Sequence, residues 1–479
     1  MEHRLYINGQ WREAADKKRF PVTNPATGEI IGEVADASAD DAKLAVEAAY
    51  QAFKSWSQET ARTRSILLYK WYQLIVQHAN ELANLMTTEQ GKPLKEAEGE
   101  VLYAADFVLW YAEEAKRIYG DLIPASSSSK RLQVIHQPVG PVFAITPWNF
   151  PAAMITRKIA PALAAGCTVI VKPSEETPLT AIRLVQLAEE AGFPAGVINL
   201  VTVSDPREVS DLLLSHPLVR KVTFTGSTEV GKLLMRKSAD TVKRVSLELG
   251  GHAPFIVFSD ADLDQAVDGV IASKFRNAGQ TCVCANRIFV EESILESFLQ
   301  KFRTKVEQLQ VGQGQQQGVE IGPLINRDAV EKVERHVQDA LEKGARLVCG
   351  GQRLLDDKYK HGHFYQPTIL ADVTRDMLIS KEETFGPVAP VYSFRTEEEV
   401  LELANHPEYG LAAYVYTSDL GRSVRMSEKL EYGIVGINDP IPSVAQAPFG
   451  GFKQSGLGRE GGKYGLEEFL EIKYVSVQI

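Results

Sequence analysis

Hydrophobic positions recur at three- and four-residue steps between about residues 61 and 88, which predicts an amphipathic helix. Its apolar face consists of Leu67, Trp71, Leu74, Ile75, His78, Leu82 and Leu85. Histidine is often partly buried without a special role, so we interpret His78 as a packing residue.

After about residue 139 the pattern changes to short apolar runs separated by helical segments. The runs cover residues 142–145, 168–171, 197–201 and 222–224. Buried strands alternating with helices are typical of βαβ units in a parallel sheet, and a second series of this kind starts at residues 253–258. The sequence therefore predicts an α/β fold.

Two other segments alternate like partly exposed strands. They cover residues 131–135 and 470–475. Such strands at the edges of a large protein are candidates for pairing between subunits.

Composition narrows the class of protein. A chain of 479 residues is expected to form two or three structural units. The net charge of -10 argues against nucleic acid or an anionic membrane as a partner. We find neither a signal-peptide pattern at the start nor an apolar run long enough to span a bilayer. Four cysteines without C-x-x-C spacing predict no disulfide framework and no metal site, and therefore a cytoplasmic protein with reduced thiols.

Two glycine-rich segments resemble nucleotide-binding motifs. Residues 456–461 match G-x-G-x-x-G, but they lie too close to the chain end for a βαβ unit, and we interpret them as a flexible loop. Residues 226–232 resemble a phosphate-binding loop, although Leu233 and Glu229 argue against an NTPase. What remains is a strand, a glycine turn and a helix start. It is either a pyrophosphate site or an ordinary βα turn.

The residues that point most clearly to chemistry are a cysteine and a glutamate. Cys282 follows Gly-Gln-Thr in a polar, turn-like stretch, where a thiolate can be accessible for attack on a carbonyl. Glu248 lies between apolar neighbours and precedes Gly250 and Gly251, which allow close backbone approach. Partial desolvation there would raise the carboxyl pKa toward that of a general base. A glutamate facing solvent on a strand is the alternative.

Together these stretches resemble the aldehyde dehydrogenase superfamily over essentially the whole chain. The matching segments are residues 24–29, 147–151, 172–175, 224–231, 247–251, 279–282, 382–387 and 448–451. The resemblance implies a Rossmann-like cofactor domain (residues 1–119 and 140–247), an α/β catalytic domain (248–440) and a small β oligomerisation flap (120–139 and 460–479). Residues 441–459 would return to the active site. It also implies a homodimer or homotetramer.

The resemblance further implies roles for individual residues. Cys282 attacks the aldehyde, Asn149 and the Cys282 N–H stabilise the oxyanion, and Glu248 activates the water that hydrolyses the thioester. No metal is needed. The cofactor, NAD or NADP, is expected to contact Thr146, Pro147, Trp148, Lys172, Ser174, Glu175, Gly226, Ser227, Val230, Leu249, Glu383 and Phe385.

Glu175 bears on the choice of cofactor. A carboxylate there can accept a hydrogen bond from a ribose 2′-hydroxyl but repels a 2′-phosphate, which slightly favours NAD. Lys172 and Ser174 could soften the repulsion. The sequence departs from the family pattern at residues 202–210, which lack the glycines that relatives often carry.

Within the superfamily the chain most resembles succinate-semialdehyde dehydrogenase. By that resemblance Arg157, Arg276 and Ser443 bind the distal carboxylate of the substrate, for which an arginine fork is well suited. Each arginine has a structural ion pair as its alternative role. Pro440 and Pro442 could reshape the pocket, so glutarate semialdehyde and broader aldehyde specificity remain alternatives.

Cys284 lies two residues after the proposed nucleophile. It either forms a reversible disulfide with oxidised Cys282 or fills the wall of the site.

Three other classes of protein compete with the main interpretation. Glu248 argues against a CoA-acylating enzyme, and Cys282 with Asn149 argues against a non-catalytic scaffold. A cysteine hydrolase would need a histidine, and none is adjacent to Cys282 in the sequence.

Overall fold

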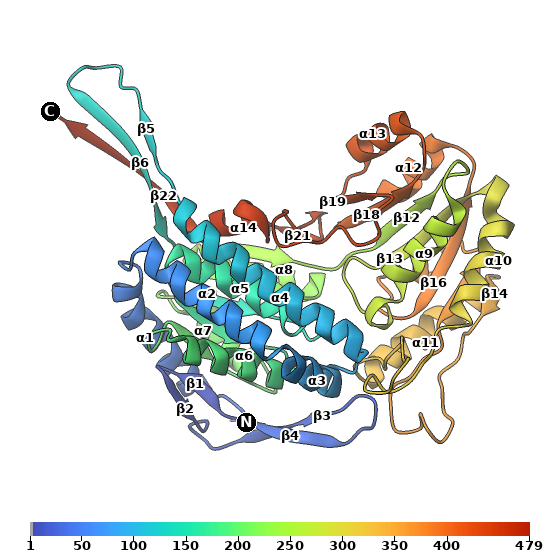
Figure 1. The fold of residues 1–479 in the computed structure, drawn as a ribbon, viewed down its shortest axis with the longest axis horizontal. Helices are drawn as coiled ribbons and strands as arrows, with labels where there is room; N and C mark the ends of the chain where they lie inside the picture. Colours follow the sequence, from blue (N-terminus) through green and yellow to red (C-terminus); the bar gives the residue numbers. More distant parts are fainter. Residues whose placement is uncertain (1–2) are drawn as a thin grey trace.

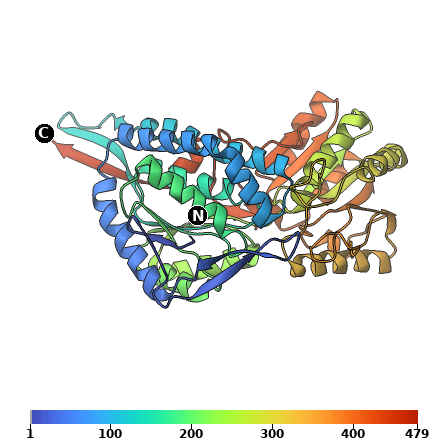
Figure 2. The ribbon, with the colours of Figure 1, turned by 60° about the horizontal axis from the view of Figure 1, so that its bottom comes forward.

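Two large sheets, each packed against helices, dominate the computed structural model, which describes residues 3–479. Figures 1 and 2 show the two sheet-and-helix units side by side, with a small three-stranded sheet projecting from one end. The α/β fold predicted from the apolar runs is therefore confirmed.

The first unit is built on an eight-stranded sheet. Its order is β2 (Gln10–Arg12), β1 (Leu5–Ile7), β9 (Ile198–Leu200), β8 (Val169–Lys172), β7 (Val142–Ile145), β10 (Lys221–Thr225), β11 (Arg244–Glu248) and β21 (Gly456–Leu457). The strands from β9 to β11 are parallel, and β1, β2 and β21 are antiparallel additions at the two edges. The apolar runs between residues 142 and 224 thus form the predicted parallel strands.

Helices cover both faces of this sheet, as the alternation of side chains along β7 shows. Val142 and Ala144 join a core on one face, and Phe143 and Ile145 join a core on the other. The first core is formed with α2 (Ala61–Gln77), α3 (Ala79–Gln90), α4 (Leu94–Glu114), α5 (Ala153–Ala165) and α6 (Pro178–Ala191). The second is formed with α1 (Ala39–Trp56), α7 (Arg207–Ser215) and α8 (Thr228–Ser238).

The helix predicted over residues 61–88 is interrupted in the structure. It divides into α2 and α3 at His78, whose backbone leaves the helical conformation. The His78 ring lies partly exposed, with Nδ1 2.8 Å from Glu81 Oε2. His78 is therefore partly buried, as expected of a packing residue, but it joins two helices instead of continuing one.

The second unit is built on a seven-stranded sheet. Its order is β14 (Arg346–Cys349), β15 (Thr368–Ala371), β16 (Val388–Phe394), β13 (Ala285–Glu291), β12 (Ala253–Val257), β18 (Ala412–Tyr416) and β19 (Ile434–Ile437). All neighbours pair in parallel except β14 with β15. Its helices are α9 (Leu263–Lys274), α10 (Leu295–Val306), α11 (Arg327–Glu342), α12 (Glu397–Asn405) and α13 (Leu420–Lys429).

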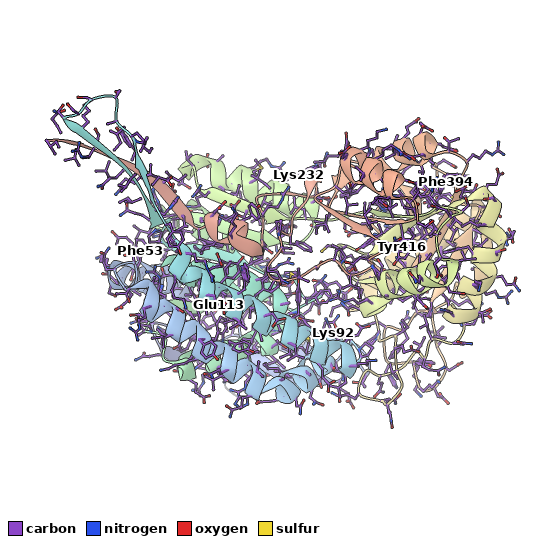
Figure 3. The ribbon with its side chains drawn as sticks, turned by 45° about the horizontal axis from the view of Figure 1, so that its top comes forward. Phe53, Lys92, Glu113, Lys232, Phe394 and Tyr416 are labelled. Atoms are coloured by element: carbon purple, nitrogen blue, oxygen red, sulfur yellow. The ribbon has the colours of Figure 1, made fainter. Side chains whose placement is uncertain are left out.

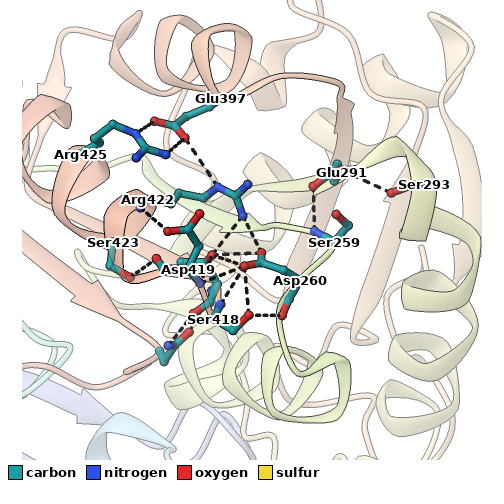
Figure 4. A network of polar contacts seen from close by, with 12 residues as sticks. Ser259, Asp260, Glu291, Ser293, Glu397, Ser418, Asp419, Arg422, Ser423 and Arg425 are labelled. Carbon is teal, nitrogen blue, oxygen red and sulfur yellow. Dashed lines mark hydrogen bonds and ion pairs between the residues drawn. The ribbon is translucent and has the colours of Figure 1, made fainter.

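A polar network joins the ends of β12 and β18 in this unit (Figure 4). The Asp260 carboxylate accepts hydrogen bonds from the Thr417 hydroxyl at 2.8 Å and from the backbone N–H of Ser418 at 3.1 Å. Arg422 of α13 pairs with the same carboxylate at 2.6 Å. The network attaches α13 to the rim of the sheet and has no contact with the candidate site described below.

The projecting sheet has the order β22 (Leu470–Gln478), β6 (Lys130–Pro138) and β5 (Asp121–Ile123). β6 and β22 contain the two segments that the sequence suggested for pairing between subunits, and they pair with each other from Leu470–Pro138 to Gln478–Lys130. The edges left for another subunit are therefore the outer edges of β5 and β22. Figure 1 shows the C-terminus at the tip of this sheet.

Small elements complete the fold. They are β3 (Arg19–Thr23) paired with β4 (Ile30–Ala35), β17 (Tyr409–Gly410) paired with β20 (Phe452–Lys453), and α14 (Gly462–Glu467). Residues 456–461 were expected to be a flexible loop. That prediction is wrong, because Gly456 and Leu457 form β21 and pair with Glu248 and Leu247 of β11. Within residues 3–479, no helix combines the length and apolarity that a membrane crossing requires.

Candidate active site

The carboxyl ends of the parallel strands in the eight-stranded sheet carry most of the residues predicted to bind a dinucleotide. Residues 146–150 follow β7, Lys172 ends β8, Gly226 and Ser227 follow β10, and Glu248 ends β11. The chain continues from β7 to β8 and β9 on one side, and returns to β10 and β11 on the other. A ligand crevice is expected at such a reversal of strand order.

A cavity of about 270 Å³ opens at this reversal. The predicted site residues that line it are Pro147, Trp148, Asn149, Gly226, Ser227, Leu249, Cys282, Glu383 and Phe385. No catalytic, cofactor or substrate contact was predicted for its other lining residues, which are Met154, Thr225, Gly250, Ala329, Lys332 and Thr384. The structure thus brings the proposed nucleophile and much of the proposed cofactor site to one cavity between the two units.

The turn after β10 has the features of a phosphate-binding turn. Ser227 is the N-cap of α8, and its hydroxyl accepts a hydrogen bond from the Val230 N–H at 3.3 Å. The Gly226 N–H is already used, since it donates to the Glu248 carbonyl at 3.0 Å. The hydroxyl of Thr225 lines the cavity, is buried and has no hydrogen-bond partner within residues 3–479. This unpaired hydroxyl, together with the helix terminus, fits a bound pyrophosphate.

Another part of the cavity wall combines two aromatic rings with a carboxylate that a hydrogen bond fixes in place. The rings of Trp148 and Phe385 pack edge to face, with centroids 5.5 Å apart. Glu383 accepts a hydrogen bond from the Gly251 N–H at 3.2 Å, and burial raises the pKa of its carboxyl to about 7. A flat apolar wall beside a hydrogen-bond acceptor is a suitable surface for a nicotinamide riboside.

Five of the residues predicted to contact the cofactor do not line this cavity, namely Thr146, Lys172, Ser174, Glu175 and Val230. Lys172 is buried, and its Nζ lies 2.9 Å from Oε2 of the more exposed Glu175. Thr146 N–H donates to the Lys172 carbonyl at 3.1 Å, and the Ser174 hydroxyl accepts from the Glu176 N–H at 3.3 Å. Lys172 is therefore an ion-pair partner of Glu175.

Cys282 is held by a tightly folded backbone. Asn277 and Ala278 have φ angles of 51° and 54°, which are strained for residues other than glycine. A Cβ on Gly251 would lie 2.3 Å from the Cys282 carbonyl oxygen, so only glycine allows this approach. The second glycine after Glu248 is thus explained by its contact with the nucleophile segment.

The Asn149 side chain reaches the same segment. Its Nδ2 donates to the Gln280 carbonyl at 3.1 Å, and its Oδ1 accepts from the Phe150 N–H at 3.1 Å. Asn149 also lines the cavity that Cys282 lines. A neutral amide donor that lines the same cavity as the proposed nucleophile is the arrangement expected of an oxyanion site.

The Cys282 thiol is partly exposed, as the sequence predicts, but it is protonated near neutral pH. Its pKa is raised to about 12, chiefly by burial, with Glu383 and Glu248 adding to the rise and Arg157 opposing it. Attack on a carbonyl carbon therefore needs a neighbouring base that accepts the thiol proton.

Glu248, which the sequence predicts to activate the hydrolytic water, is buried. Only 3% of its surface is exposed, and Oε2 has no hydrogen-bond partner within the described chain. Burial raises the pKa of Glu248 well above its usual range, and the neighbouring charge of Glu460 raises it further. The alternative of a solvent-facing glutamate is wrong.

Glu460 and Lys158 are site residues that the sequence analysis missed. Lys158 Nζ lies 2.5 Å from Glu460 Oε1, and Arg157 Nε lies 2.5 Å from Glu460 Oε2. These cations hold the pKa of Glu460 below its usual range despite burial. Glu460 belongs to the segment interpreted as a flexible loop. The adjacent Arg157 and Lys158 in an otherwise apolar helix were the available sign that a buried acid must lie opposite them.

A second cavity, of about 510 Å³, holds two of the three predicted carboxylate ligands. Arg276 and Ser443 line it together with Phe150 and Tyr103. The Arg276 guanidinium lies 4.8 Å from the centre of the Phe150 ring. Within residues 3–479 it makes no hydrogen bond, and no carboxylate lies within 4.0 Å of it. Its fork is therefore open to a ligand.

Arg157 has a different environment. It is 1% exposed, it pairs with Glu460, and it lines neither cavity. Its guanidinium also lies 4.2 Å from the centre of the Phe449 ring. The structure thus gives Arg157 the structural ion pair that the sequence left open as an alternative, and its role as a carboxylate ligand stays a prediction.

Cys284 is completely buried and lines neither cavity. The Lys274 ammonium donates to its sulfur at 3.3 Å, and burial raises the pKa of its thiol. This environment is that of a residue filling the wall of the site. Disulfide formation with Cys282 stays a prediction.

Comparison with known proteins gives consistent matches over the whole chain. The model of the aldehyde dehydrogenase family matches residues 11–475. A succinate-semialdehyde dehydrogenase [NADP(+)] of Escherichia coli is 56% identical over 98% of this chain and 97% of its own. A 3-sulfolactaldehyde dehydrogenase of Pseudomonas putida is 55% identical over 99% and 97%.

A glutarate-semialdehyde dehydrogenase of Pseudomonas putida is 53% identical over 99% of this chain and 97% of its own. Among solved structures, that of succinate-semialdehyde dehydrogenase from Burkholderia pseudomallei superposes with a TM-score of 0.97 and 52% identity, covering 100% of this chain and 98% of the other. The likeness therefore extends from the sequence to the arrangement of both units.

Proposed function

The chain belongs to the aldehyde dehydrogenase family and is an NAD(P)-dependent enzyme that oxidises an aldehyde to a carboxylic acid, and from this premise we propose that its substrate is succinate semialdehyde. The observation that carries the proposal is the unpaired Arg276 guanidinium in a cavity beside the site of Cys282. An arginine fork there can bind the distal carboxylate while the aldehyde reaches the sulfur.

In the proposed reaction the Cys282 sulfur forms a bond to the aldehyde carbon while a base accepts the thiol proton. The Asn149 amide and the Cys282 N–H stabilise the oxygen of the resulting thiohemiacetal. A nicotinamide bound in the cavity would supply a hydride acceptor for this carbon. Glu248 then takes a proton from water, whose oxygen attacks the thioester and releases the acid and the Cys282 thiolate, to which Glu248 returns the proton.

The relatives support an anionic substrate but differ in its identity. Succinate and glutarate semialdehydes carry a distal carboxylate, and sulfolactaldehyde carries a sulfonate. An arginine fork can bind both groups. Glutarate semialdehyde is therefore the first alternative, and a broad-specificity aldehyde dehydrogenase, in which Arg276 makes no contact with the substrate, is the second.

We propose that the enzyme uses both dinucleotides with a slight preference for NAD. The Glu175 carboxylate disfavours a 2′-phosphate, whereas its ion pair with Lys172 weakens that repulsion. The similarity to an NADP-dependent relative supports only a small difference between the use of NAD and the use of NADP.

We further propose a cytoplasmic homodimer or homotetramer with the domain boundaries given above. The projecting sheet supports oligomer formation, since Leu122 and Ile472 on it are 81% and 73% exposed.

The test is a steady-state assay of the purified enzyme with NAD and NADP in turn. Succinate semialdehyde, glutarate semialdehyde and hexanal are compared by kcat/KM, with a Cys282→Ser variant as the inactive control. We expect succinate semialdehyde to give the highest value. A higher value for glutarate semialdehyde would replace the proposed substrate, and an equal value for hexanal would remove the role of Arg276. Undiminished dinucleotide reduction by Cys282→Ser would overturn the chemistry itself.

A further inference from the structure

The C-terminal end of α3 and the turn after it are buried where the two units meet, at the point labelled Lys92 in Figure 3. Glu89, Gln90 and Lys92 have at most 1% of their surface exposed. None of the three lines the dinucleotide cavity or the Arg276 cavity. Burying three polar side chains so completely is costly unless each has a specific partner.

Glu89 holds the start of α6. Its Oε2 accepts from the Leu179 N–H and its Oε1 from the Thr180 N–H, both at 2.8 Å. Thr177, at the N-cap position of α6, makes no capping bond with its own side chain. A carboxylate from 90 residues upstream therefore caps this helix. The capped turn continues directly from the loop that carries Glu175 on the dinucleotide side.

Gln90 holds the nucleophile segment. Its Nε2 donates to Asn277 Oδ1 at 3.1 Å, and its Oε1 accepts from the Lys92 N–H at 3.0 Å. The same Asn277 has a φ of 51° and donates from Nδ2 to the Asn149 carbonyl at 3.0 Å. Gln90 thus orients the residue whose strained backbone begins the turn toward Cys282.

Lys92 holds the loop of the oxyanion residue. Its ammonium donates to the Asn149 carbonyl at 2.7 Å and pairs with Glu100. Glu100 in turn accepts from the N–H groups of Ala152 and Ala153, at 2.9 and 3.2 Å. Both ends of the loop from residue 149 to residue 153 are therefore attached to this buried ion pair.

We infer that residues 89–92 act as positioning residues that set three parts of the active site separately: Glu89 the dinucleotide loop, Gln90 the nucleophile turn and Lys92 the Asn149 loop. Because the contacts are made by different side chains to different segments, their removal should have different consequences. A segment that only stabilised the fold would give the same consequence at each position.

The experiment compares Glu89→Gln with Gln90→Met. Glu89→Gln leaves one acceptor for two N–H groups, and Gln90→Met keeps the length while removing the donor to Asn277. The control is Glu81→Gln, which also removes a carboxylate linking α3 to α6, through Arg183 at 2.7 Å, but at the surface. The two measurements are the Kd for NADP by calorimetry and the rate at which iodoacetamide alkylates Cys282. Neither uses an aldehyde, so the result is independent of the proposed substrate.

We expect a crossed pattern. Glu89→Gln should raise the Kd for NADP about tenfold, as for one lost hydrogen bond to a charged group, and change the alkylation rate less than about twofold. Gln90→Met should change the alkylation rate several-fold and leave the Kd within about twofold. Glu81→Gln should match the wild type in both measurements.

Equal changes in both measurements for both variants would overturn the inference, as would a wild-type result for either. If Gln90→Met does not fold, Gln90→Glu removes the same donor and keeps the acceptor for the Lys92 N–H. An unchanged alkylation rate in that variant would equally refute the role of Gln90.

Discussion

Replacing Arg276 with alanine tests the proposed recognition of the distal carboxylate directly. The guanidinium lines the 510 Å³ cavity, has no ion-pair partner within residues 3–479, and is only partly buried. A hydrogen bond to a charged group contributes about 1.5–3 kcal/mol, which corresponds to roughly 10- to 150-fold in kcat/KM. Glu96 interacts electrostatically with Arg276 and offsets part of its charge. We therefore expect a loss toward the lower end, about tenfold to thirtyfold, for succinate semialdehyde.

The discriminating quantity is the ratio of kcat/KM for succinate semialdehyde to that for hexanal. Arg276→Ala also removes the contact with the Phe150 ring, and that packing loss affects both aldehydes. Dividing one value by the other cancels it. Arg276→Lys keeps the positive charge without the planar fork and should show an intermediate ratio. Arg327→Ala, which removes an exposed arginine paired with Glu331, serves as the matched control.

The loss for succinate semialdehyde should lie mainly in KM, because the interaction forms when the substrate binds and persists in the transition state. An equal fall in kcat/KM for both aldehydes in Arg276→Ala would refute the reasoning. It would mean that the arginine supports the shape of the site and does not contact the carboxylate.

Three further predictions concern the base, the nucleophile turn and the dinucleotide. Since burial raises the pKa of Glu248 well above its usual range, only higher pH ionises it. Turnover should therefore rise with pH over a range above that in which an ordinary glutamate ionises, and a pH profile of Glu248→Gln without this rise would support the assignment. Gly251→Ala places a Cβ against the Cys282 carbonyl oxygen and should reduce kcat at least tenfold. A wild-type kcat in that variant would contradict the contact. Glu175→Gln should leave kcat/KM for NAD within about threefold and raise that for NADP several-fold, and an unchanged ratio of the two would show that Glu175 does not select the cofactor.

The fold could be predicted largely from periodicity, because buried parallel strands are continuous apolar runs whatever their surroundings. The break at His78 could not, since α2 and α3 share one apolar face and only the backbone conformation separates them. The catalytic candidates were found from their short motifs. The partners that set their chemistry were missed, because they lie far away in the sequence. Glu460 lies 302 residues from Lys158, and the Glu89–Lys92 segment contacts residues that are 57 to 187 positions away.

The pair of carboxylates in the site shows why such distant partners matter. Two buried acids close together cannot both be ionised cheaply, so the cations decide which one carries the charge. Arg157 and Lys158 both contact Glu460, whose pKa is lowered, and the charge held there adds to the rise that burial causes in the pKa of Glu248. Which of the two carboxyl groups ionises more readily is therefore set by the position of two cations on α5. Removing the Lys158 ammonium takes away one cation that lowers the pKa of Glu460. The pH dependence of turnover should change as a result, although Lys158 lines neither cavity of the site.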